Sequence, residues 1–294
     1  MSENTEKVLS FEDATGTIDY TLTNDYMFRA ILQSNEKVLR GLIGSLLHLK
    51  QEEIQSVEIK NPIELGKAIN DKNFIMDIRV LLNNNAIINL EMQVSNHGDW
   101  TDRALSYLCR AFDNLQKGKE YEQVLPAIHI GILDFILFPD APEFYATNKL
   151  MNVRSHKVFN DKFVLNVLSL KQIELATEED IFWELDKWAA LFSAKTWRDI
   201  KMIAKNNEVF TSASETLYQF NSDDMIREQC LARLDYERHE RYVKNKLAEQ
   251  EQALKECRDT ISEQADTISE QADTIKEQAE LIKTLQEQLA EKNK

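Results

Sequence analysis

The clearest pattern of hydrophobic and polar positions lies between residues 74 and 94, where the two kinds of residue alternate as in a β-strand. The sequence Asn83–Asn85 interrupts this alternation at its centre. Asn tolerates the left-handed backbone conformation that tight turns require, so the pattern predicts a β-hairpin that is symmetric about Asn84. In this register Asp77 lies opposite Glu91.

The predicted hairpin has one apolar face and one polar face, because side chains alternate along a strand. The apolar face, which we expect to lie in the core, carries Phe74, Met76, Ile78, Val80 and Leu82 together with Ala86, Ile88, Leu90, Met92 and Val94. The polar face carries Asp77, Arg79, Asn89, Glu91 and Gln93. We therefore expect any chemistry of the hairpin on this second face.

Two facing carboxylates on the polar face suggest a metal site. Residues directly opposite in an antiparallel pair have Cβ atoms roughly 4.5–5.5 Å apart, and like charges so placed destabilise the sheet unless a cation lies between them. Carboxylate oxygens are hard ligands that suit Mg²⁺ or Mn²⁺. Asp77 and Glu91 are thus candidate metal ligands. The alternative is a solvent-exposed face on which Arg79 neutralises both acids.

The remaining chain alternates between helical and strand-like periodicity, which predicts a mixed α/β fold. The expected helices span about residues 25–49, with a break near Ser34–Asn35, residues 100–117, and several segments within 176–246. The expected strands outside the hairpin span residues 54–59, 126–137 and 163–170.

The helix expected at residues 100–117 has a basic face. This face carries, at helical spacing, Arg103, Tyr107, Arg110, Asn114 and Lys117. Positive side chains with an aromatic ring among them suit a phosphate backbone. Because the helix follows soon after Gln93, its first half should lie beside the acidic pair. Without that neighbour, a solvated helix face would be the simpler interpretation.

From Leu247 onward the sequence becomes a heptad repeat. The unit DTISEQA occurs at residues 259–265 and 266–272, and DTIKEQA follows at 273–279. Large apolar residues recur every seven positions, at Leu247, Leu254, Ile261, Ile268, Ile275, Ile282 and Leu289. Ala265, Ala272 and Ala279 each follow an Ile by four residues, as the alternate seam positions of a coiled coil should. We expect homo-oligomerisation through this segment, the alternative being a lone and partly helical appendage.

Composition and charge narrow the functional classes. The net charge of −15 argues against general nucleic-acid affinity, so a DNA-binding protein of this composition needs a local basic surface, to which Lys72 could contribute. Three scattered cysteines indicate a reducing compartment. No signal peptide or membrane span of roughly 18 apolar residues is evident, so we expect a cytoplasmic protein. His129, within an apolar run, fits a core histidine better than a metal ligand.

Several segments together resemble a known nuclease family. Asp77, thirteen residues and then Glu91-Met92-Gln93 form D-x(13)-E-x-Q, which resembles the metal-binding signature of PD-(D/E)xK nucleases, with Gln where many members have Lys. Flanking segments resemble one branch, the Rpn recombination-promoting nucleases, also called PD-(D/E)xK nuclease family transposases. These segments are NDYMF at 24–28, KNFIMDIR at 72–79, NLEMQ at 89–93, RALSY at 103–107, and residues 118–121 with 126–133. The ordered set is specific and covers about residues 20–240.

The resemblance implies a restriction-endonuclease-like core of order αβββαβ and a metal-dependent DNA endonuclease with a role in recombination or mobile-element activity. Asp77 and Glu91 would hold Mg²⁺ or Mn²⁺, and Gln93 would orient a water without acting as a general base. It also makes Asp25, in the first helix, a weaker candidate for the site. The rival function is a catalytically inactive nuclease-like scaffold that binds DNA or protein and oligomerises through its coiled coil.

These observations predict four consecutive regions. We expect a mobile N-terminal tail at residues 1–20, a nuclease-like core at 21–175, a helical region at 176–246 and a coiled coil at 247–294.

Overall fold

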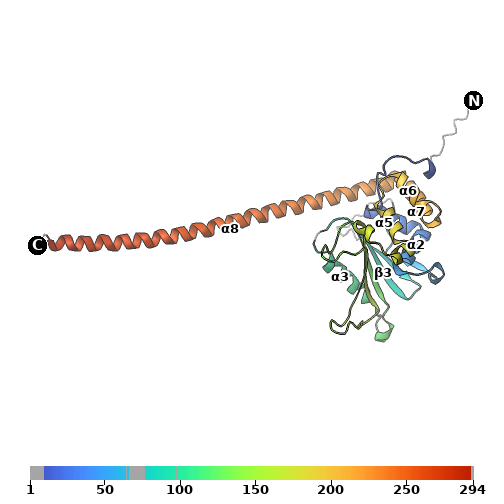
Figure 1. Cartoon of the computed structure of the whole chain (residues 1–294), viewed down its shortest axis with the longest axis horizontal. Helices are drawn as coiled ribbons and strands as arrows, with labels where there is room; N and C mark the ends of the chain where they lie inside the picture. Colours follow the sequence, from blue (N-terminus) through green and yellow to red (C-terminus); the bar gives the residue numbers. More distant parts are fainter. Residues whose placement is uncertain (1–9, 64, 66–76, 97, 293–294) are drawn as a thin grey trace, which may run out of the picture. The chain divides into compact units, whose positions relative to one another are not determined.

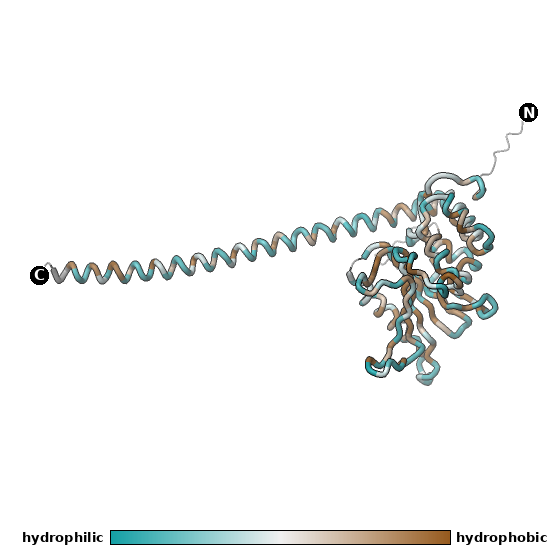
Figure 2. The backbone as a smooth tube through the Cα atoms, viewed as in Figure 1, coloured by the Kyte–Doolittle hydropathy of each residue, from teal (hydrophilic) through white to brown (hydrophobic). Residues whose placement is uncertain are grey.

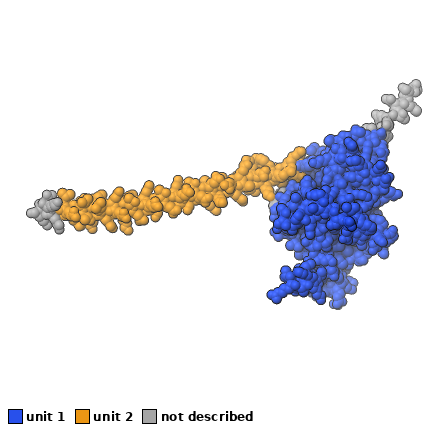
Figure 3. All heavy atoms as spheres, viewed as in Figure 1, with its two compact units in different colours: residues 1–234 blue, residues 235–294 orange. Residues whose placement is uncertain are grey.

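The computed structural model describes residues 10–63, 65, 77–96 and 98–292. The chain forms two compact units, residues 1–234 and residues 235–294, which Figure 3 distinguishes by colour. The candidate phosphate contact Lys72 and the hairpin residues Phe74 and Met76 lie outside the described residues.

A six-stranded mixed sheet forms the centre of the first unit (Figure 1). Its strands are β1 Val57–Ile59, β2 Ile78–Leu82, β3 Ala86–Gln93, β4 Ala127–Leu133, β5 Tyr145–Lys149 and β6 Phe163–Ser169. They lie in the order β1-β2-β3-β4-β6-β5. The first three strands are an antiparallel meander, β3, β4 and β6 are mutually parallel neighbours, and β5 is an antiparallel edge strand. The expected mixed α/β fold is confirmed, whereas β5 was not predicted because its residues are largely exposed and polar.

The predicted hairpin register is confirmed over strands β2 and β3. Leu82 pairs with Ala86, Arg79 with Asn89, and Ile78 with Leu90. Asn83 and Asn84 have positive φ angles of 49° and 54°, so the turn uses the conformation that made Asn favourable there. The residues of the expected apolar face from Ile78 to Met92 are all buried, whereas Val94 at its end is half-buried.

Helices α1, α2, α5 and α7 contribute to the main hydrophobic core with the apolar face of the sheet. The helices are α1 Asp25–Ser34, α2 Glu36–Leu47, α4 Glu178–Phe182, α5 Leu185–Ser193, α6 Trp197–Ala204 and α7 Glu208–Asn221. Short 3-10 helices occupy Phe11–Asp13, Gln51–Glu53, Tyr121–Gln123 and Leu170–Leu175.

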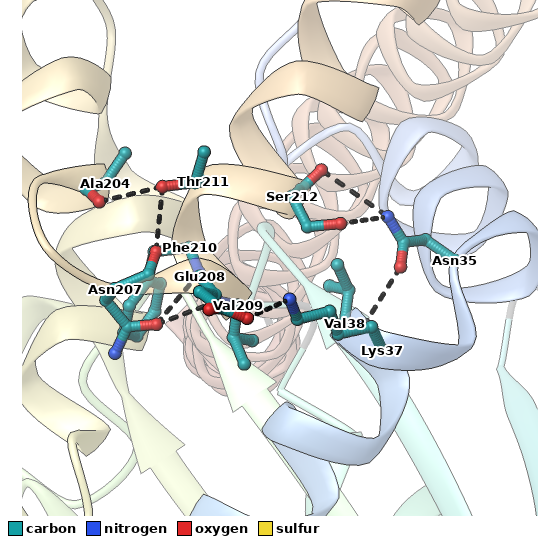
Figure 4. A network of polar contacts seen from close by, with 10 residues as sticks. All are labelled: Asn35, Lys37, Val38, Ala204, Asn207, Glu208, Val209, Phe210, Thr211 and Ser212. Carbon is teal, nitrogen blue, oxygen red and sulfur yellow. Dashed lines mark hydrogen bonds and ion pairs between the residues drawn. The ribbon is translucent and has the colours of Figure 1, made fainter.

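Asn35 separates α1 from α2, where the sequence predicted a break. Its side-chain oxygen accepts a hydrogen bond from the backbone N–H of Val38 and so caps α2. Its amide donates to the Ser212 hydroxyl at 2.8 Å, and Lys37 pairs with Glu208 at 2.8 Å (Figure 4). These contacts attach the start of α2 to α7.

The opposite face of the sheet is covered by α3, Trp100–Phe112, which connects the parallel strands β3 and β4. Trp100, Ala104, Leu108 and Ala111 form its buried side. The helix is shorter than expected, because the Asn114 side chain accepts from Leu125 N and donates to Leu125 O, which fixes a loop after Asp113. The predicted basic face therefore retains Arg103, Tyr107 and Arg110, whereas Asn114 and Lys117 lie beyond the helix.

The described part of the expected N-terminal tail packs against the first unit. Phe11 and Ile18 are buried in the main core, and Ile18 N donates to Lys195 O at 2.9 Å. Thr17 forms an isolated antiparallel bridge with Thr196. The expectation of a mobile tail is therefore wrong from residue 10 onward. A few well-spaced apolar side chains are enough to attach an otherwise polar segment to the core.

Helix α8 runs from Asp224 to Lys292 and includes the predicted heptad segment. Its residues alternate between hydrophilic and hydrophobic along the length of the helix (Figure 2). The seven large apolar heptad residues, from Leu247 to Leu289, are each 54–65% exposed in the single chain. None of the helices in the described part of the chain has the length and apolar character needed to cross a membrane.

Candidate active site

The polar face of the hairpin lies beneath α3 and gathers the acidic residues that the sequence singled out. Asp77 immediately precedes β2, whereas Glu91 and Gln93 lie near the end of β3. Glu91 is only 8% exposed. The alternative of a solvent-exposed acidic face does not hold for Glu91, which pairs with Arg103 of α3, whereas Asp77 is half-buried.

Hydrogen bonds hold the backbone of Asp77, whereas burial disfavours the charged form of its carboxylate. Its carbonyl oxygen accepts from Arg29 Nη1 at 2.5 Å and from Asn61 Nδ2 at 3.0 Å. Burial raises the pKa of the Asp77 carboxyl above its ordinary value, and the nearby Glu91 charge raises it further, whereas the Arg29 charge lowers it. Ile78 pairs with Leu90 in the hairpin register, so Asp77 and Glu91 follow that pair at the open end of the hairpin.

The Glu91 carboxylate lies beside Arg103 and His129. Arg103 Nη2 lies 2.7 Å from Glu91 Oε1, and the same nitrogen donates to Gln93 Oε1 at 2.6 Å. His129 Nε2, on the neighbouring strand β4, lies 3.4 Å from Glu91 Oε2. The Arg103 guanidinium thus joins the two residues of the E-x-Q sequence.

His129 is completely buried beside this acidic pair. Its Nδ1 is 3.0 Å from Asn89 Nδ2, and its ring centre is 6.1 Å from those of Trp100 and Tyr107. The expectation of a core histidine agrees with this burial, but the sequence did not indicate that His129 would lie beside Glu91. Only the parallel pairing of β3 with β4, which places Asn89 opposite His129, brings it there.

Tyr107 extends the site along α3. Burial raises the pKa of its hydroxyl, and the charges of Glu91 and Asp77 raise it further. The Arg110 guanidinium lies 5.9 Å from the Tyr107 ring centre, within the range of a cation–π interaction. The described part of the basic face is therefore adjacent to the acidic pair.

The donor chemistry of this site fits a hard divalent cation. Asp77 Oδ1 and Glu91 Oε2 are buried oxygen atoms without a hydrogen-bond partner among the described residues. Such oxygens are costly to leave unsatisfied, and both belong to ligand types that Mg²⁺ and Mn²⁺ prefer. The described residues contain no group of three or more His, Cys, Asp and Glu arranged to hold a metal.

A family model described as PD-(D/E)XK nuclease family transposase matches residues 22–247. The chain belongs to this family. Comparisons with curated proteins and with solved structures found no match. Family membership indicates a nuclease or transposase role, and the match includes the whole sheet, α3 and the acidic pair.

Asp25, the weaker candidate, lies in a different environment from the acidic pair of this transposase-family domain. It pairs with Arg233 of α8 at 2.6 Å and is 5% exposed. Burial raises the pKa of its carboxyl, and Arg233 lowers it. Its neighbour Asn24 caps α1 and donates to Cys230 O at 3.1 Å. These contacts give Asp25 a structural role in attaching α8 to α1.

Arg29 is the site residue that sequence reasoning missed. It lies one turn after Asp25 in α1 and is 1% exposed, yet it bonds to the carbonyl groups of Asp77 and Asn61. An arginine within the apolar positions of the first helix was the available signal, because a buried guanidinium needs partners.

Proposed function

We propose that this protein is a metal-dependent DNA endonuclease that hydrolyses phosphodiester bonds, with a recombination or mobile-element role similar to that of Rpn nucleases. The observation that supports this function best is the pair of Asp77 and Glu91, each with a buried carboxylate oxygen that lacks a hydrogen-bond partner among the described residues. Membership of a nuclease-type transposase family supports the same reaction class.

Asp77 and Glu91 would hold Mg²⁺ or Mn²⁺ through their carboxylate oxygens. When bound, such an ion lowers the pKa of a water and stabilises negative charge on the scissile phosphate. Arg29 and Asn61 hold the Asp77 backbone, so the carboxylate can ligate without losing its support. His129 restricts the position of the Glu91 carboxylate from the side of β4.

Gln93 replaces the lysine of many superfamily members and carries no positive charge. Its oxygen accepts from Arg103, and its amide donates to Ser95 O at 2.9 Å, so the side chain is held in one orientation. One amide hydrogen remains to orient a water. Arg103 supplies the missing positive charge at this position and can stabilise the developing charge on the phosphate.

DNA would contact the basic face of α3, where Arg103, Tyr107 and Arg110 lie beside the acidic pair. Arg79, on the polar face of the hairpin, and Lys72 are further candidate phosphate contacts. Residues 247–294 would join copies of the chain through the exposed heptad residues, because one helix alone cannot bury them. A cytoplasmic location is consistent with this activity and with the three free thiols.

Plasmid digestion tests the proposal directly. Supercoiled DNA is incubated with the protein in Mg²⁺, Mn²⁺, Ca²⁺ or EDTA, and the wild type is compared with Asp77→Ala. We expect nicked or linear product with Mg²⁺ or Mn²⁺ and none with EDTA or with the variant. Glu58→Ala, which removes an exposed carboxylate from strand β1, is the matched control and should cut as the wild type does.

The scaffold alternative predicts a different result in the same assay. Arg103 already neutralises Glu91 in the single chain, which is the observation that favours an inactive nuclease-like protein. If DNA is bound in fluorescence anisotropy but remains intact with every metal, the scaffold function replaces the endonuclease. Digestion that Asp77→Ala leaves unchanged would place the catalytic centre elsewhere.

A further inference from the structure

The exposed heptad residues of α8 define two seam positions. The large residues Leu247, Leu254, Ile261, Ile268, Ile275, Ile282 and Leu289 occupy the d positions. The a positions, three residues before each d, hold Lys244, Glu251, Arg258, Ala265, Ala272, Ala279 and Gln286. The d residues are therefore all large and apolar, whereas the a residues are small, charged or polar.

A parallel pair of these helices would have poorly matched layers. In a parallel dimer each a residue faces the same residue of the partner, and each d residue does likewise. Lys244, Glu251 and Arg258 would each face a like charge. Three layers of facing alanines would alternate with layers of facing isoleucines, which hold the helices apart and leave voids at the alanines. Ile at d with a small residue at a is also unlike the pattern that favours parallel dimers.

An antiparallel pair matches the same residues well. When helices run in opposite directions, a residues of one face d residues of the other. One register pairs every a position with a d position, because their residue numbers add to 533 in all seven cases: 244 with 289, 251 with 282, 258 with 275, 265 with 268, 272 with 261, 279 with 254, and 286 with 247. Each layer then contains one large side chain, and no charged a residue faces its own copy.

We propose that α8 binds a second copy of itself as an antiparallel two-stranded coiled coil in this register. The proposal rests on the self-association included in the proposed function and adds its orientation and number of strands. A shift of seven residues keeps large residues opposite small ones but leaves one pair of seam positions at each end unpaired, so the full register is the most stable. At 1.5 Å per residue, the two copies of Leu247 would lie about 60 Å apart along the dimer axis.

This arrangement gives the dimer a defined geometry. The first unit joins α8 before Leu247, so the two copies of that unit attach at opposite ends of the paired segment.

Disulfide trapping in the full-length chain distinguishes the orientations. The exposed cysteines are first replaced, as Cys109→Ser and Cys257→Ser, and Cys230 stays because it is buried. One chain then carries Leu247→Cys, and a second chain with an affinity tag of different mass carries Gln286→Cys. The chains are co-expressed or purified separately, oxidised with diamide and separated on a non-reducing gel.

The antiparallel register predicts a disulfide between the two different chains and little product from either variant alone. Leu247→Cys with Ala279→Cys, which a seven-residue shift would pair, should give a weaker mixed product. Glu249→Cys with Gln288→Cys, placed away from the seam at the same ends, should give none. Dominant products within each single variant indicate parallel helices and overturn the proposal, and a stronger product with Ala279→Cys overturns the register.

Light scattering of the full-length protein separates failure of the orientation from failure of self-association. The proposal requires twice the chain mass of 34.2 kDa at tens of micromolar. A trimer or tetramer overturns the two-stranded arrangement but leaves self-association standing. A monomer overturns both, while the metal-dependent digestion assay still decides the endonuclease function independently.

Discussion

Gly131 offers a sharp test of how the fold supports the acidic pair. It lies on β4 directly opposite Glu91 of β3, and the Trp100 ring occupies the space above it. A Cβ atom added at Gly131 would lie 2.1 Å from Trp100 Cζ2, well short of the 3.4 Å at which ordinary contact begins. Trp100 begins α3, which carries Arg103 one turn later. Gly131→Ala should therefore displace the start of α3 and the ion pair with Glu91.

The expected magnitude follows from overpacking of a closed site. Trp100 is 2% exposed and has little room to move, so the free energy of unfolding should fall by about 1–3 kcal/mol. For a domain of this size, that change lowers the melting temperature by about 2–12 °C. Metal-dependent DNA cleavage should fall further than stability alone explains, because Arg103 and Glu91 lose their alignment.

A double-mutant cycle with Trp100→Phe isolates the steric cause. Phe lacks the outer indole ring that meets the added methyl group, and Trp100 Nε1 is buried without a hydrogen-bond partner among the described residues. Trp100→Phe alone should cost less than the roughly 3–5 kcal/mol of truncation to Ala. The double variant should be more stable than the sum of the single changes predicts, by about 0.5–3 kcal/mol.

Thermal melting of the four proteins, followed by circular dichroism in EDTA, measures these differences. Additive effects of the two substitutions would refute the reasoning, because they would mean that the methyl group and the indole do not compete for one space. A Gly131→Ala protein with wild-type melting and wild-type cleavage would show that α3 does not depend on this contact.

Three further predictions concern charge and assembly. The raised pKa of Asp77 means that the folded state binds this proton more tightly than the unfolded chain, so the charged carboxylate destabilises the fold above that pKa. Asp77→Asn should raise the melting temperature in EDTA at pH 7, and this increase should disappear as the pH falls toward 3.8. An equal increase in melting temperature at both pH values would contradict this account. Arg103→Ala should weaken DNA binding and reduce the slope of log affinity against log salt concentration by roughly 0.9. Fluorescence anisotropy between about 50 and 200 mM salt measures this slope. An unchanged slope would mean that DNA binds elsewhere on the protein. Truncation after Val243 should give a smaller species in light scattering with an unchanged melting transition for the first unit, and persistent self-association would place the interface outside the heptads.

The sequence by itself determined the hairpin and its register. Alternation of apolar and polar residues placed the faces correctly, and the Asn83–Asn85 turn set the pairing, because a shift of one residue would turn every apolar side chain to the polar side. The break at Asn35 and the length of the heptad segment were also readable, since capping and seven-residue periodicity are local properties. The E-x-Q sequence and the opposing aspartate identified the acidic pair before any contact was known.

Only the tertiary structure decided what surrounds that pair. Arg29 comes from a helix far away in the sequence, and His129 comes from a strand whose parallel neighbour no local pattern reveals. The early end of α3 depends on hydrogen bonds between Asn114 and Leu125, and the attachment of residues 10–20 depends on Phe11 and Ile18 finding the core. Each of these features arises from contacts between distant segments, and periodicity within one segment carries no information about them.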